Sequence, residues 1–281
     1  MDISGKTAVV TGGGSGIGRG IALTLAREGA AVAIADIIEA SARKVAAEIE
    51  AVGGRAAAIA CDVTDRASVA AMKAQAEAEL GPVSLLVANA GVTMFEELTD
   101  MSDADVDWVI DVSLYGVVHC VQAFVPSMIE RREGHIVATA SVAGLMAPFI
   151  GRHAPYCGAK AGIIGFMLSL RPDLAPYNVG ASVFCPSAVD SRIVESPRYR
   201  PAQYGGPATG EVTLPDGAGQ EGHAVSRPAE EAGEMVVEAI RANRAVIVTD
   251  PSHRAGFERG MVAQVLEAFD AAAAFDAARG K

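Results

Sequence analysis

Seven short apolar runs alternate with longer segments of helical periodicity along this 281-residue chain. Within 45–52 and 69–80, for example, apolar residues recur on one helical face. Strands that alternate with amphipathic helices are typical of βαβ units, and right-handed crossovers then place helices on both faces of the sheet. We therefore predict a single α/β domain with a doubly wound, mostly parallel, seven-stranded sheet. The predicted strands are Ala8–Thr11, Ala31–Asp36, Ala56–Cys61, Val83–Ala88, His135–Ala140, Ala181–Cys185 and Ala245–Thr249.

The first apolar run leads into a glycine-rich turn, Thr11–Gly18, and then into the helical stretch Arg19–Glu28. Glycines permit a tight turn and close approach of the backbone to a ligand, and the free N–H groups of a helix N-terminus attract a pyrophosphate. A glycine-rich loop alone can be a flexible turn, but this position between strand and helix predicts a dinucleotide site. The residues of the turn assigned to that site are Gly12, Ser15, Gly16, Ile17 and Gly18.

Asp36 closes the second apolar run, eighteen residues after Gly18. A carboxylate at this position can accept hydrogen bonds from both hydroxyls of an adenosine ribose, and it repels a 2′-phosphate. Ile37 and Ser15 occupy the two places where a cation for that phosphate is expected. These residues favour NAD over NADP as the cofactor, with Ile37 beside the ribose. The alternative is that Asp36 only caps the helical segment that begins near Glu39.

Tyr156 and Lys160 are one helical turn apart, and Tyr156 follows Ser141 by fifteen residues. A phenol with a pKa near ~10 is a poor base at neutral pH, but a neighbouring ammonium favours the phenolate. We expect Lys160 to lower the pKa of Tyr156 and make it a usable general acid/base. Ser141 ends a predicted strand, at the sheet edge where open α/β sheets bind ligands. A Tyr-x-x-x-Lys spacing arises by chance on many helices, so the glycine-rich turn and Asp36 carry much of this interpretation.

Together these motifs resemble those of the short-chain dehydrogenases/reductases, single-domain nicotinamide-dependent enzymes with a Rossmann-like fold. The resemblance covers nearly the whole chain. It matches the family pattern Thr-Gly-x-x-x-Gly-x-Gly to Thr11–Gly18, and it implies that Asp62 and Val63 contact adenine and that Ser141, Tyr156 and Lys160 form the catalytic set. The further cofactor contacts that the resemblance implies are Asn89, Ala90, Gly91, Tyr156, Lys160, Pro186, Val189 and Ser191.

Two positions depart from the family pattern. Ser113 stands where the family has an asparagine that supports a local helix distortion, whose carbonyl holds a water on the active-site lysine. Serine can also bond backbone groups within a helix, so Ser113 joins the candidate catalytic residues. Ser187 replaces a usual glycine after Pro186. These departures leave open a second class of function, a catalytically weak NAD-binding redox sensor or scaffold, although the intact catalytic set favours an enzyme.

The resemblance implies reversible oxidation of a secondary alcohol to a ketone by hydride transfer to the nicotinamide. Tyr156 would take the alcohol proton, Ser141 would bind the substrate oxygen, and Lys160 would hold the nicotinamide ribose. The stretch Glu195–Tyr204 and the long C-terminus resemble those of bacterial enzymes that oxidise benzylic alcohols of lignin-derived aryl ethers, although a steroid, a cyclic alcohol or another aryl carbinol stays open. The candidate substrate residues are bulky and mostly apolar, which favours a hydrophobic or aryl substrate: Met94, Phe95, Val142, Met146, Phe149, His153 and Tyr199.

The sequence also predicts the structure of three further segments. Residues from about 190 to 227 contain four prolines and many glycines, and we expect a mobile lid over the substrate. Tyr199 and Tyr204 in this segment would either contact a ligand or pin the loop. Pro172 predicts a kink or break near Arg171 in the helix that carries Tyr156. The C-terminal extension, about 252–279, is expected to be an amphipathic helix packed on its own subunit or a neighbour.

Composition fits one core-forming domain, with 51% apolar and 20% charged residues. Acidic residues outnumber basic ones by 34 to 23, which argues against nucleic-acid or anionic-membrane partners. Four scattered cysteines and five histidines without ligand spacing indicate neither a disulfide framework nor a metal site. The N-terminus lacks a secretory signal pattern and we expect no apolar run near ~18 residues, so a cytoplasmic protein is expected. The family resemblance implies a homo-oligomer, a tetramer or a dimer.

Overall fold

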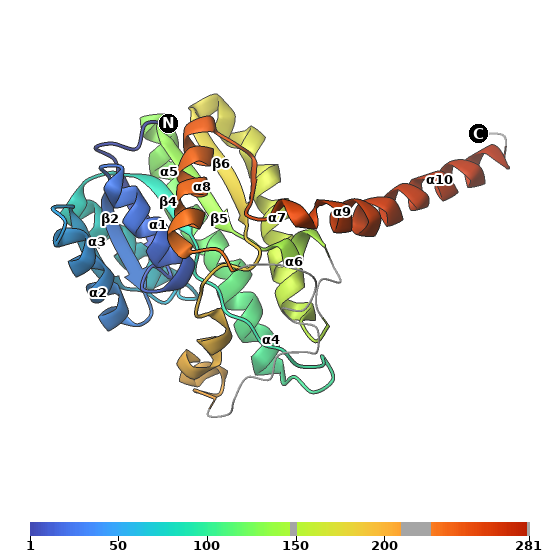
Figure 1. Cartoon of the computed structure of the whole chain (residues 1–281), viewed down its shortest axis with the longest axis horizontal. Coiled ribbons are helices and arrows are strands. Elements are labelled where there is room, and N and C mark those ends of the chain that lie inside the picture. Colours follow the sequence, from blue (N-terminus) through green and yellow to red (C-terminus); the bar gives the residue numbers. More distant parts are fainter. Residues whose placement is uncertain (147–150, 209–225, 280–281) are drawn as a thin grey trace.

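The computed structural model describes residues 1–146, 151–208 and 226–279. A seven-stranded sheet lies at the centre of this part of the chain, all of its neighbouring strands are parallel, and the strand order is β3-β2-β1-β4-β5-β6-β7. Helices cover both faces (Figure 1). The doubly wound fold and all seven predicted strands are confirmed. The strands are β1 (Thr7–Thr11), β2 (Ala31–Asp36), β3 (Ala56–Ala60), β4 (Val83–Ala88), β5 (Gly134–Thr139), β6 (Val179–Cys185) and β7 (Val246–Val248).

Helical segments connect the strands and extend the chain beyond β7. The α-helices are α1 (Gly16–Arg27), α2 (Glu39–Glu50), α3 (Arg66–Leu80), α4 (Asp103–Ile110), α5 (Gly116–Arg131), α6 (Val142–Leu145), α7 (Ala154–Leu174), α8 (Ala229–Ala242), α9 (Arg254–Phe257) and α10 (Ala263–Ala277). A π-helical turn, η1 (Asp111–Tyr115), joins α4 to α5. The segment η6 (Glu258–Val262), between α9 and α10, contains a kink, because Gly260 has non-helical φ and ψ angles of −87° and −106°. The 3₁₀ segments are η2 (Ala175–Tyr177), η3 (Ile193–Tyr199), η4 (Ala202–Tyr204) and η5 (Pro251–His253).

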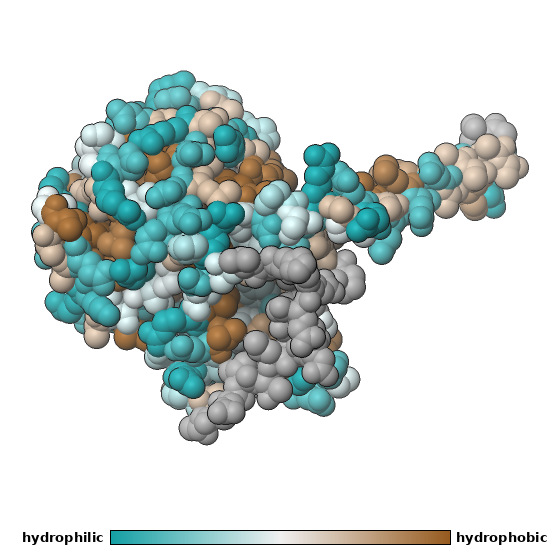
Figure 2. Space-filling model, in the orientation of Figure 1, coloured by the Kyte–Doolittle hydropathy of each residue, from teal (hydrophilic) through white to brown (hydrophobic). Residues whose placement is uncertain are grey.

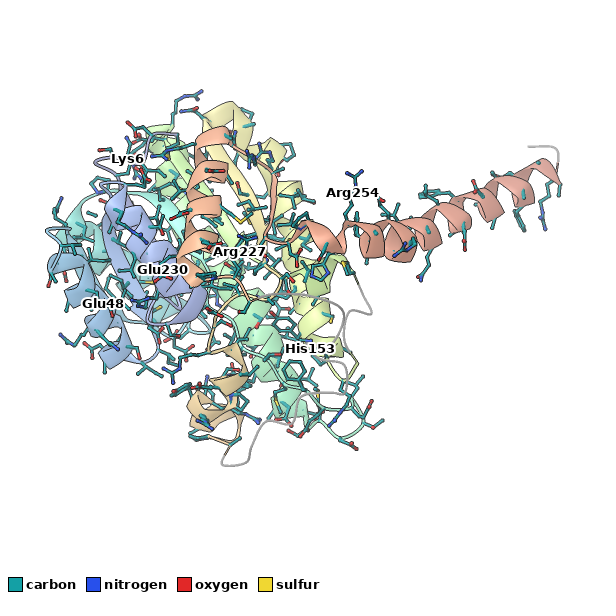
Figure 3. The ribbon with its side chains drawn as sticks, viewed as in Figure 1. Lys6, Glu48, His153, Arg227, Glu230 and Arg254 are labelled. Atoms are coloured by element: carbon teal, nitrogen blue, oxygen red, sulfur yellow. The ribbon has the colours of Figure 1, made fainter. Side chains whose placement is uncertain are left out.

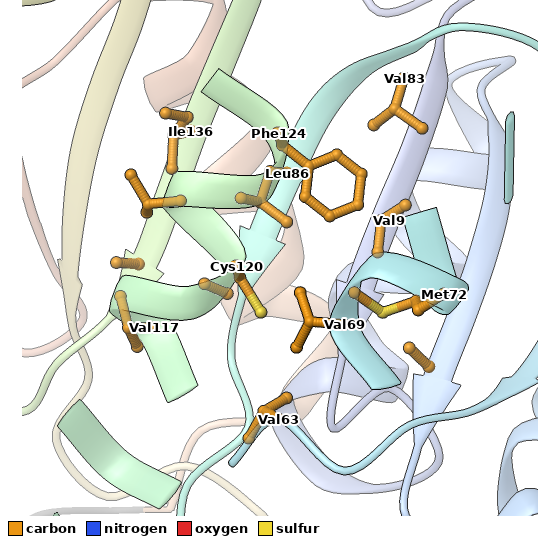
Figure 4. Packing of buried hydrophobic residues seen from close by; sticks show 14 of the residues in the cluster. Val9, Val63, Val69, Met72, Val83, Leu86, Val117, Cys120, Phe124 and Ile136 are labelled. Atoms are coloured by element: carbon orange, nitrogen blue, oxygen red, sulfur yellow. The ribbon is translucent and has the colours of Figure 1, made fainter. Parts of the chain in front are cut away.

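The two faces of the sheet bury separate apolar cores. Neighbouring residues of a strand point to opposite faces, so Val9 belongs to the core under α3, α5 and α7, and Val10 to the core under α1, α2 and α8. Figure 4 shows the first core, where Phe124 packs near Leu86 and Met72 lies near Val9. Each fully buried side chain of this kind stabilises the fold by about 1.5–3 kcal/mol. These cores fix the strand ends on which the site is built.

The continuous helical stretch Asp103–Arg131, formed by α4, η1 and α5, is apolar and long enough to cross a membrane by length and composition alone. The expectation that the chain holds no apolar stretch of this length is therefore wrong. Half of the apolar window is buried within the domain, and Trp108 and Phe124 are fully buried. A core helix of a folded domain shows this pattern of burial.

The sequence predicted a kink or a break near Arg171, but helix α7 continues past Pro172 to Leu174, so the break is wrong. Proline in a helix removes one backbone hydrogen bond, and here it stands only two residues before the helix ends. Arg171 also fastens this end, because its guanidinium donates to Asn243 Oδ1 at 3.0 Å and to the carbonyl of Ala181. Anchoring by a neighbouring strand and loop outweighs the local cost of the proline.

The C-terminal helices α9 and α10 point away from the domain body (Figure 1). The residues of α10 after Ala263 are exposed within the described structure, including Leu266 at 57% and Phe269 at 69%. The amphipathic helix is thus present as predicted, but its packing on its own subunit is not observed in the described residues. Figure 2 shows hydrophobic residues on the surface of this arm.

Candidate active site

The turn after β1 is built for close contact with a ligand backbone. Gly12 and Gly16 have φ angles of 61° and 50°, which glycine adopts without strain. A Cβ on Gly18 would lie 2.2 Å from the carbonyl oxygen of Gly12, so this position leaves no room for a side chain. Ser15 is the N-cap of α1, and the N-terminal end of that helix faces the groove. This arrangement suits a pyrophosphate, as predicted from the glycine pattern.

Asn89 ties three strand ends together beneath the groove. Its side-chain amide donates to the carbonyl of Thr11 at 3.1 Å, and its Oδ1 accepts from Thr139 at 3.0 Å. The Thr11 hydroxyl in turn accepts from the backbone N–H groups of Asn89 and Ala90 at 3.0 and 3.1 Å. Asn89 therefore joins β1, β4 and β5, and its contribution to the groove includes holding the glycine-rich turn in place.

Asp36 lies where β2 ends, and both of its carboxylate oxygens accept backbone hydrogen bonds. Oδ2 accepts from Gly14 at 3.0 Å and Oδ1 accepts from Ile38 at 2.9 Å. Burial raises the pKa of Asp36, while these two hydrogen bonds and the Arg192 charge oppose the rise. The N-cap of α2 is Ile38, so Asp36 supports the start of that helix without capping it. Carboxylate oxygens have further lone pairs, so ribose hydroxyls can still donate to Asp36.

A single groove runs along the carboxyl ends of the strands, from the Asp36 end to the Tyr156 end. This is the edge at which open parallel sheets bind ligands. The donor set fits a dinucleotide, since a helix N-terminus, a carboxylate at one end and a phenol with an ammonium at the other lie along the same groove. The predicted cofactor residues among its lining are Gly12, Ser15, Gly16, Ile17, Gly18, Asp36, Ile37, Asp62, Val63, Asn89, Ala90, Gly91, Tyr156, Lys160, Pro186 and Ser191.

Val189 is the predicted cofactor residue that lies elsewhere. It is 8% exposed and belongs to the core under α8, and it forms an isolated parallel bridge with Arg227. Ser187, the departure beside Pro186, receives a definite role in the structure. Its backbone N–H donates to Thr249 Oγ1 at 2.9 Å, and its hydroxyl lies 2.5 Å from His253 Nε2. The loop after β6 is thereby fastened to the segment that follows β7.

Tyr156, Lys160 and Ser141 converge at the other end of the groove. Tyr156 and Lys160 are both buried on α7, and Ser141 is the N-cap of α6. Ser141 and the Tyr156 hydroxyl are hydrogen-bonded to each other. Lys160 Nζ lies 5.4 Å from the centre of the Tyr156 ring and donates to the carbonyl of Thr139 at 2.8 Å. The structure thus brings the three predicted catalytic residues together.

The pKa of Tyr156 differs from the expectation. Burial raises it to about 12, and the hydrogen bond with Ser141 opposes this rise only in part. Lys160 does not overcome the burial effect, because its ammonium is directed to the Thr139 carbonyl and is itself buried. Burial lowers the pKa of Lys160 to about 8. The expected lowering of the tyrosine pKa is therefore not found in this structure, where the neutral phenol is the favoured form.

Ser113 lies within the π-helical turn η1, fully buried. Its hydroxyl donates to the carbonyl of Val92 at 3.0 Å and accepts from the Val92 N–H at 3.1 Å. A Cβ on Gly91 would lie 3.2 Å from Lys160 Nζ and 3.7 Å from Ser113 Oγ. Ser113 thus accompanies a helix distortion near the lysine, the feature that the resemblance implied for the asparagine at this position.

The predicted substrate residues do not form one surface. Tyr199 lines the groove, and Met94 packs beside the cluster that contains Tyr156. Val142 is buried, whereas the Met146 side chain reaches Gly256 at the base of the C-terminal arm. Phe95 and His153 stack on each other near Tyr156. Phe149 lies outside the described residues.

The first part of the predicted lid, through residue 208, is held by specific contacts. A nearly buried ion pair joins Arg200 to Asp105 on α4, and the Tyr204 hydroxyl donates to Asp111 Oδ2 at 2.9 Å. Ser196 Oγ accepts from the Thr93 N–H at 3.1 Å. Of the two tyrosines, Tyr204 pins the segment, while Tyr199 faces the groove. The rest of the predicted lid includes residues 209–225, which lie outside the described structure.

Several groove residues were not found from the sequence. They come from segments brought together by the fold and carry no motif: Ile38, Ser41, Cys61, Val92, Trp108, Val112, Thr139, Ala140, Arg192, Ile193, Ser196 and Pro201. Of these residues, only Arg192 could have been predicted from the sequence, because it directly follows the predicted nicotinamide segment and carries a charge.

Comparison with curated proteins identifies relatives over most of the chain. The C alpha-dehydrogenase of Sphingobium sp. (strain SYK-6) is 34% identical over 260 residues, which cover 92% of this chain and 85% of that protein. The oxidoreductase UcpA of Escherichia coli (strain K12) is 40% identical over 194 residues, covering 69% of this chain and 73% of that protein.

Solved structures show the same fold. A short-chain dehydrogenase/reductase from Burkholderia phymatum in complex with NAD matches with a TM-score of 0.83 and 31% identity, covering 92% of this chain and 93% of that one. The apo form of LigD from Sphingobium sp. strain SYK-6 matches with a TM-score of 0.78 and 29% identity, covering 94% and 97%. The family model for short chain dehydrogenases matches residues 6–201. Since the family model matches most of the chain and Ser141 lies with the groove residues Tyr156 and Lys160, the chain belongs to the short-chain dehydrogenase family.

Proposed function

We propose that this protein is an NAD-dependent oxidoreductase that interconverts a hydrophobic, aryl-bearing secondary alcohol and its ketone. The observation that carries the proposal is that Tyr156 and Lys160 line the same groove as the glycine-rich turn and Asp36. A second support is the likeness to a C alpha-dehydrogenase over 92% of the chain. The apolar side chains near Tyr156, among them Met94 and Trp108, favour a hydrophobic substrate.

The cofactor residues divide into three groups along the groove. The turn around Gly16 and the N-terminus of α1 would hold the pyrophosphate, and Asp36 would accept hydrogen bonds from the adenosine ribose and disfavour NADP. Lys160 would donate to the nicotinamide ribose. When bound, NAD supplies or accepts the hydride, the chemistry that the protein side chains themselves lack.

Tyr156 would exchange a proton with the substrate oxygen, and Ser141 would hydrogen-bond that oxygen. Because burial raises the pKa of Tyr156 to about 12, the phenol is protonated at neutral pH and ready to donate to a ketone. Alcohol oxidation needs the phenolate, so its rate should rise as the pH rises from 7 toward 10. Ketone reduction should show no such rise, and a flat oxidation rate across this range would argue against Tyr156 as the base.

The test is a panel of secondary alcohols, including aryl carbinols, incubated with NAD or NADP and followed by the absorbance of the reduced nicotinamide. The variant Tyr156→Phe should retain NAD affinity but lose about 10²- to 10⁴-fold in turnover, the usual contribution of a general acid/base. The matched control is Tyr177→Phe, because Tyr177 is 40% exposed on the separate segment η2. Full turnover by Tyr156→Phe would remove the phenol from the mechanism.

The sensor alternative rested on Ser113 and Ser187. Both serines make defined hydrogen bonds that support the site, Ser113 to the loop after β4 and Ser187 to Thr249 and His253. Neither set of hydrogen bonds favours an NAD-binding protein that lacks catalytic activity. We therefore keep the enzyme as the proposal, acting as a homo-oligomer, either a tetramer or a dimer. Clear NAD binding without turnover of any alcohol in the panel would revive the sensor.

A further inference from the structure

Arg192 is a charged side chain of the groove that the proposed chemistry does not use. It follows β6 in the chain and is among the described residues that line the groove. A Cβ on Gly16 would lie 3.0 Å from the Cα of Ser191 and 3.4 Å from the backbone nitrogen of Arg192. The main chain at Arg192 therefore lies against the glycine-rich turn, next to the N-terminus of α1.

The backbone that leads to Arg192 is fixed by the segment before α8. Val189 forms a parallel bridge with Arg227, and the N–H of Arg227 donates to the carbonyl of Ala188 at 3.0 Å. The N–H of Asp190 donates in turn to the carbonyl of Arg227 at 2.9 Å. These backbone hydrogen bonds hold the start of the Arg192 side chain beside the glycine-rich turn.

Cations are scarce along the groove. The charged side chains among its described lining residues are Asp36, Asp62, Lys160 and Arg192. Lys160 is buried at the catalytic end and donates to the carbonyl of Thr139 at 2.8 Å. The whole chain has a formal net charge of −11, which repels an anionic ligand. Arg192 is therefore the lining cation that can offset the charge of a pyrophosphate at the glycine-rich turn.

A second arginine near the same helix end is already engaged elsewhere. Arg19, in the first turn of α1, donates to Glu48 at 2.6 and 3.0 Å and to Glu230 at 2.8 Å. Figure 3 shows these two carboxylates on α2 and α8, the helices that pack against α1. Arg19 is not among the described residues that line the groove. Its charge is directed to the two carboxylates, which leaves the groove to Arg192.

The guanidinium of Arg192 is held by two residues of its own segment. Nε and Nη2 donate to Glu195 Oε2 at 3.0 and 2.8 Å, and Nη2 also donates to the Tyr199 hydroxyl. The side chains of Arg192 and Glu195 are 47% and 36% exposed. Burial raises the pKa of Asp36, and the Arg192 charge is among the groups that oppose this rise. An exposed ion pair contributes little to stability, so Arg192 can exchange Glu195 for a stronger partner.

Arginine binds phosphate through a planar fork of N–H donors, and such charge-assisted hydrogen bonds are stronger than neutral ones. We propose that Arg192 leaves Glu195 when NAD binds and donates to the pyrophosphate of the cofactor. The N-terminus of α1 and this guanidinium then hold the pyrophosphate together, and Glu195 competes with the cofactor for Arg192. This inference rests on the proposed NAD-dependent function and adds a residue to its cofactor site.

A purely structural role is the alternative for Arg192. In that role its bonds to Glu195 and Tyr199 would only keep the segment η3 in shape. The two roles make opposite predictions for Glu195. Under our proposal Glu195→Gln frees Arg192 and tightens the binding of a phosphate ligand, whereas under the structural role the loss of either partner of the pair weakens binding alike.

The first experiment compares ADP, which carries a pyrophosphate, with adenosine, which carries none. Their dissociation constants are measured by calorimetry, adenosine in competition with ADP. In Arg192→Met, which removes the charge of an exposed side chain, we expect the dissociation constants of ADP and NAD to rise by about tenfold, the usual effect of losing a hydrogen bond between charged groups. That of adenosine should stay within about twofold. An unchanged value for ADP, or an equal rise for adenosine, would overturn the inference.

The second experiment tests the exchange of partners with the same ligands. In Glu195→Gln the dissociation constant of ADP should fall by about threefold, because the competing carboxylate has lost its charge. Arg192→Lys should lie between the unmodified protein and Arg192→Met, since lysine keeps the charge but lacks the fork. Unchanged or weaker binding of ADP by Glu195→Gln contradicts the exchange.

The matched control is Arg198→Met, which removes the same charge from an exposed residue of the same segment. Arg198 is not among the described lining residues of the groove, so the dissociation constant of ADP should stay within about twofold. A rise equal to that in Arg192→Met would trace the effect to the overall charge of the protein and would overturn the inference.

The salt dependence and the activity separate this inference from the proposed function. Raising NaCl from about 0.05 to about 0.5 M should weaken ADP binding less in Arg192→Met than in the unmodified protein, because salt screens exposed charges. An equal salt dependence in the two proteins contradicts the inference. If ADP binding depends on Arg192 but no alcohol is oxidised, the proposed function fails alone. If alcohols are oxidised with NAD but Arg192→Met binds ADP normally, this inference fails alone.

Discussion

The two ends of the groove are built in different ways. The dinucleotide end is made of backbone groups and short side chains from the turns that directly follow β1, β2 and β4, and each turn is a short continuous stretch of the sequence. The substrate end is assembled from side chains of separate segments. Ser196 reaches Thr93, and Arg200 reaches Asp105, across about a hundred residues of chain.

This contrast explains why the two ends respond differently to sequence change. A backbone site tolerates few substitutions, because a new Cβ collides with main-chain atoms that cannot move aside. A side-chain site can change its ligand without loss of the fold. Variants at the dinucleotide end should therefore abolish cofactor binding, and variants at the substrate end should alter substrate preference.

The largest effect is expected for Gly18→Ala. The added Cβ would lie 2.2 Å from the Gly12 carbonyl oxygen, so the turn must deform. We expect NAD binding to weaken by about a hundredfold or more, equal to about 3 kcal/mol. Calorimetric titration with NAD measures this change. Gly165→Ala is the matched control, since its Cβ would meet no described atom within 4 Å, and unaltered NAD binding by Gly18→Ala would break the contrast.

Residues at the dinucleotide end carry sequence motifs because each of its turns is a short continuous stretch of the chain. The glycine pattern and the acid after β2 are direct consequences of a backbone site at strand ends, so Gly12, Gly18 and Asp36 were all placed in the groove. Of the substrate candidates, Tyr199 is the one found among the described residues that line the groove. Met146 and Val142 were chosen for their apolar character, but the fold directs them elsewhere, while Trp108 and Ser196 arrive from segments with no motif.

The next largest effect is expected for the pH dependence of stability, through Lys160, a buried lysine at the substrate end of the groove. Its pKa falls from 10.5 to about 8 on burial, so between these pH values the unfolded chain keeps a proton that the folded protein has lost. The free energy of unfolding therefore rises with pH in this window, by about 3 kcal/mol for this group alone. Below pH 8 both states are protonated, and the contribution stays constant.

Urea unfolding of the protein and of Lys160→Met, at pH 7.5, 9 and 10.5, isolates the contribution of Lys160 to the pH dependence, because methionine does not titrate. The difference in unfolding free energy between the two should shift in favour of the unmodified protein as pH rises. A difference that is constant with pH would show that Lys160 keeps an ordinary pKa. The contribution of Tyr156 to this pH dependence has the opposite sign, since its raised pKa makes folding less favourable above pH 10.

A smaller effect is expected for Arg200→Met at the substrate end. Arg200 pairs with Asp105, and both side chains are nearly buried, at 11% and 12% exposed. Loss of this anchor should displace the segment that carries Ser196 and Tyr199, and a small misplacement can raise the KM for the alcohol by about tenfold. The KM for NAD should stay nearly constant.

Steady-state kinetics with each substrate varied in turn measures the two constants. Arg198→Met is the control, because Arg198 is exposed on the same segment. An equal rise in the KM for NAD would show that the two ends of the groove are coupled through this segment, and the contrast between them would then fail.

The smallest effect is expected when residues 263–281 are deleted. No residue of α10 is buried within the described structure, so the helix contributes little to the stability of its own domain. We expect the free energy of unfolding, measured in urea on dilute protein, to change by less than about 0.5 kcal/mol. The variant Phe269→Ala, which removes one exposed ring of this helix, should change the free energy of unfolding equally little. A loss of stability that grows with protein concentration would contradict this expectation, because mass action would then place α10 against a second subunit.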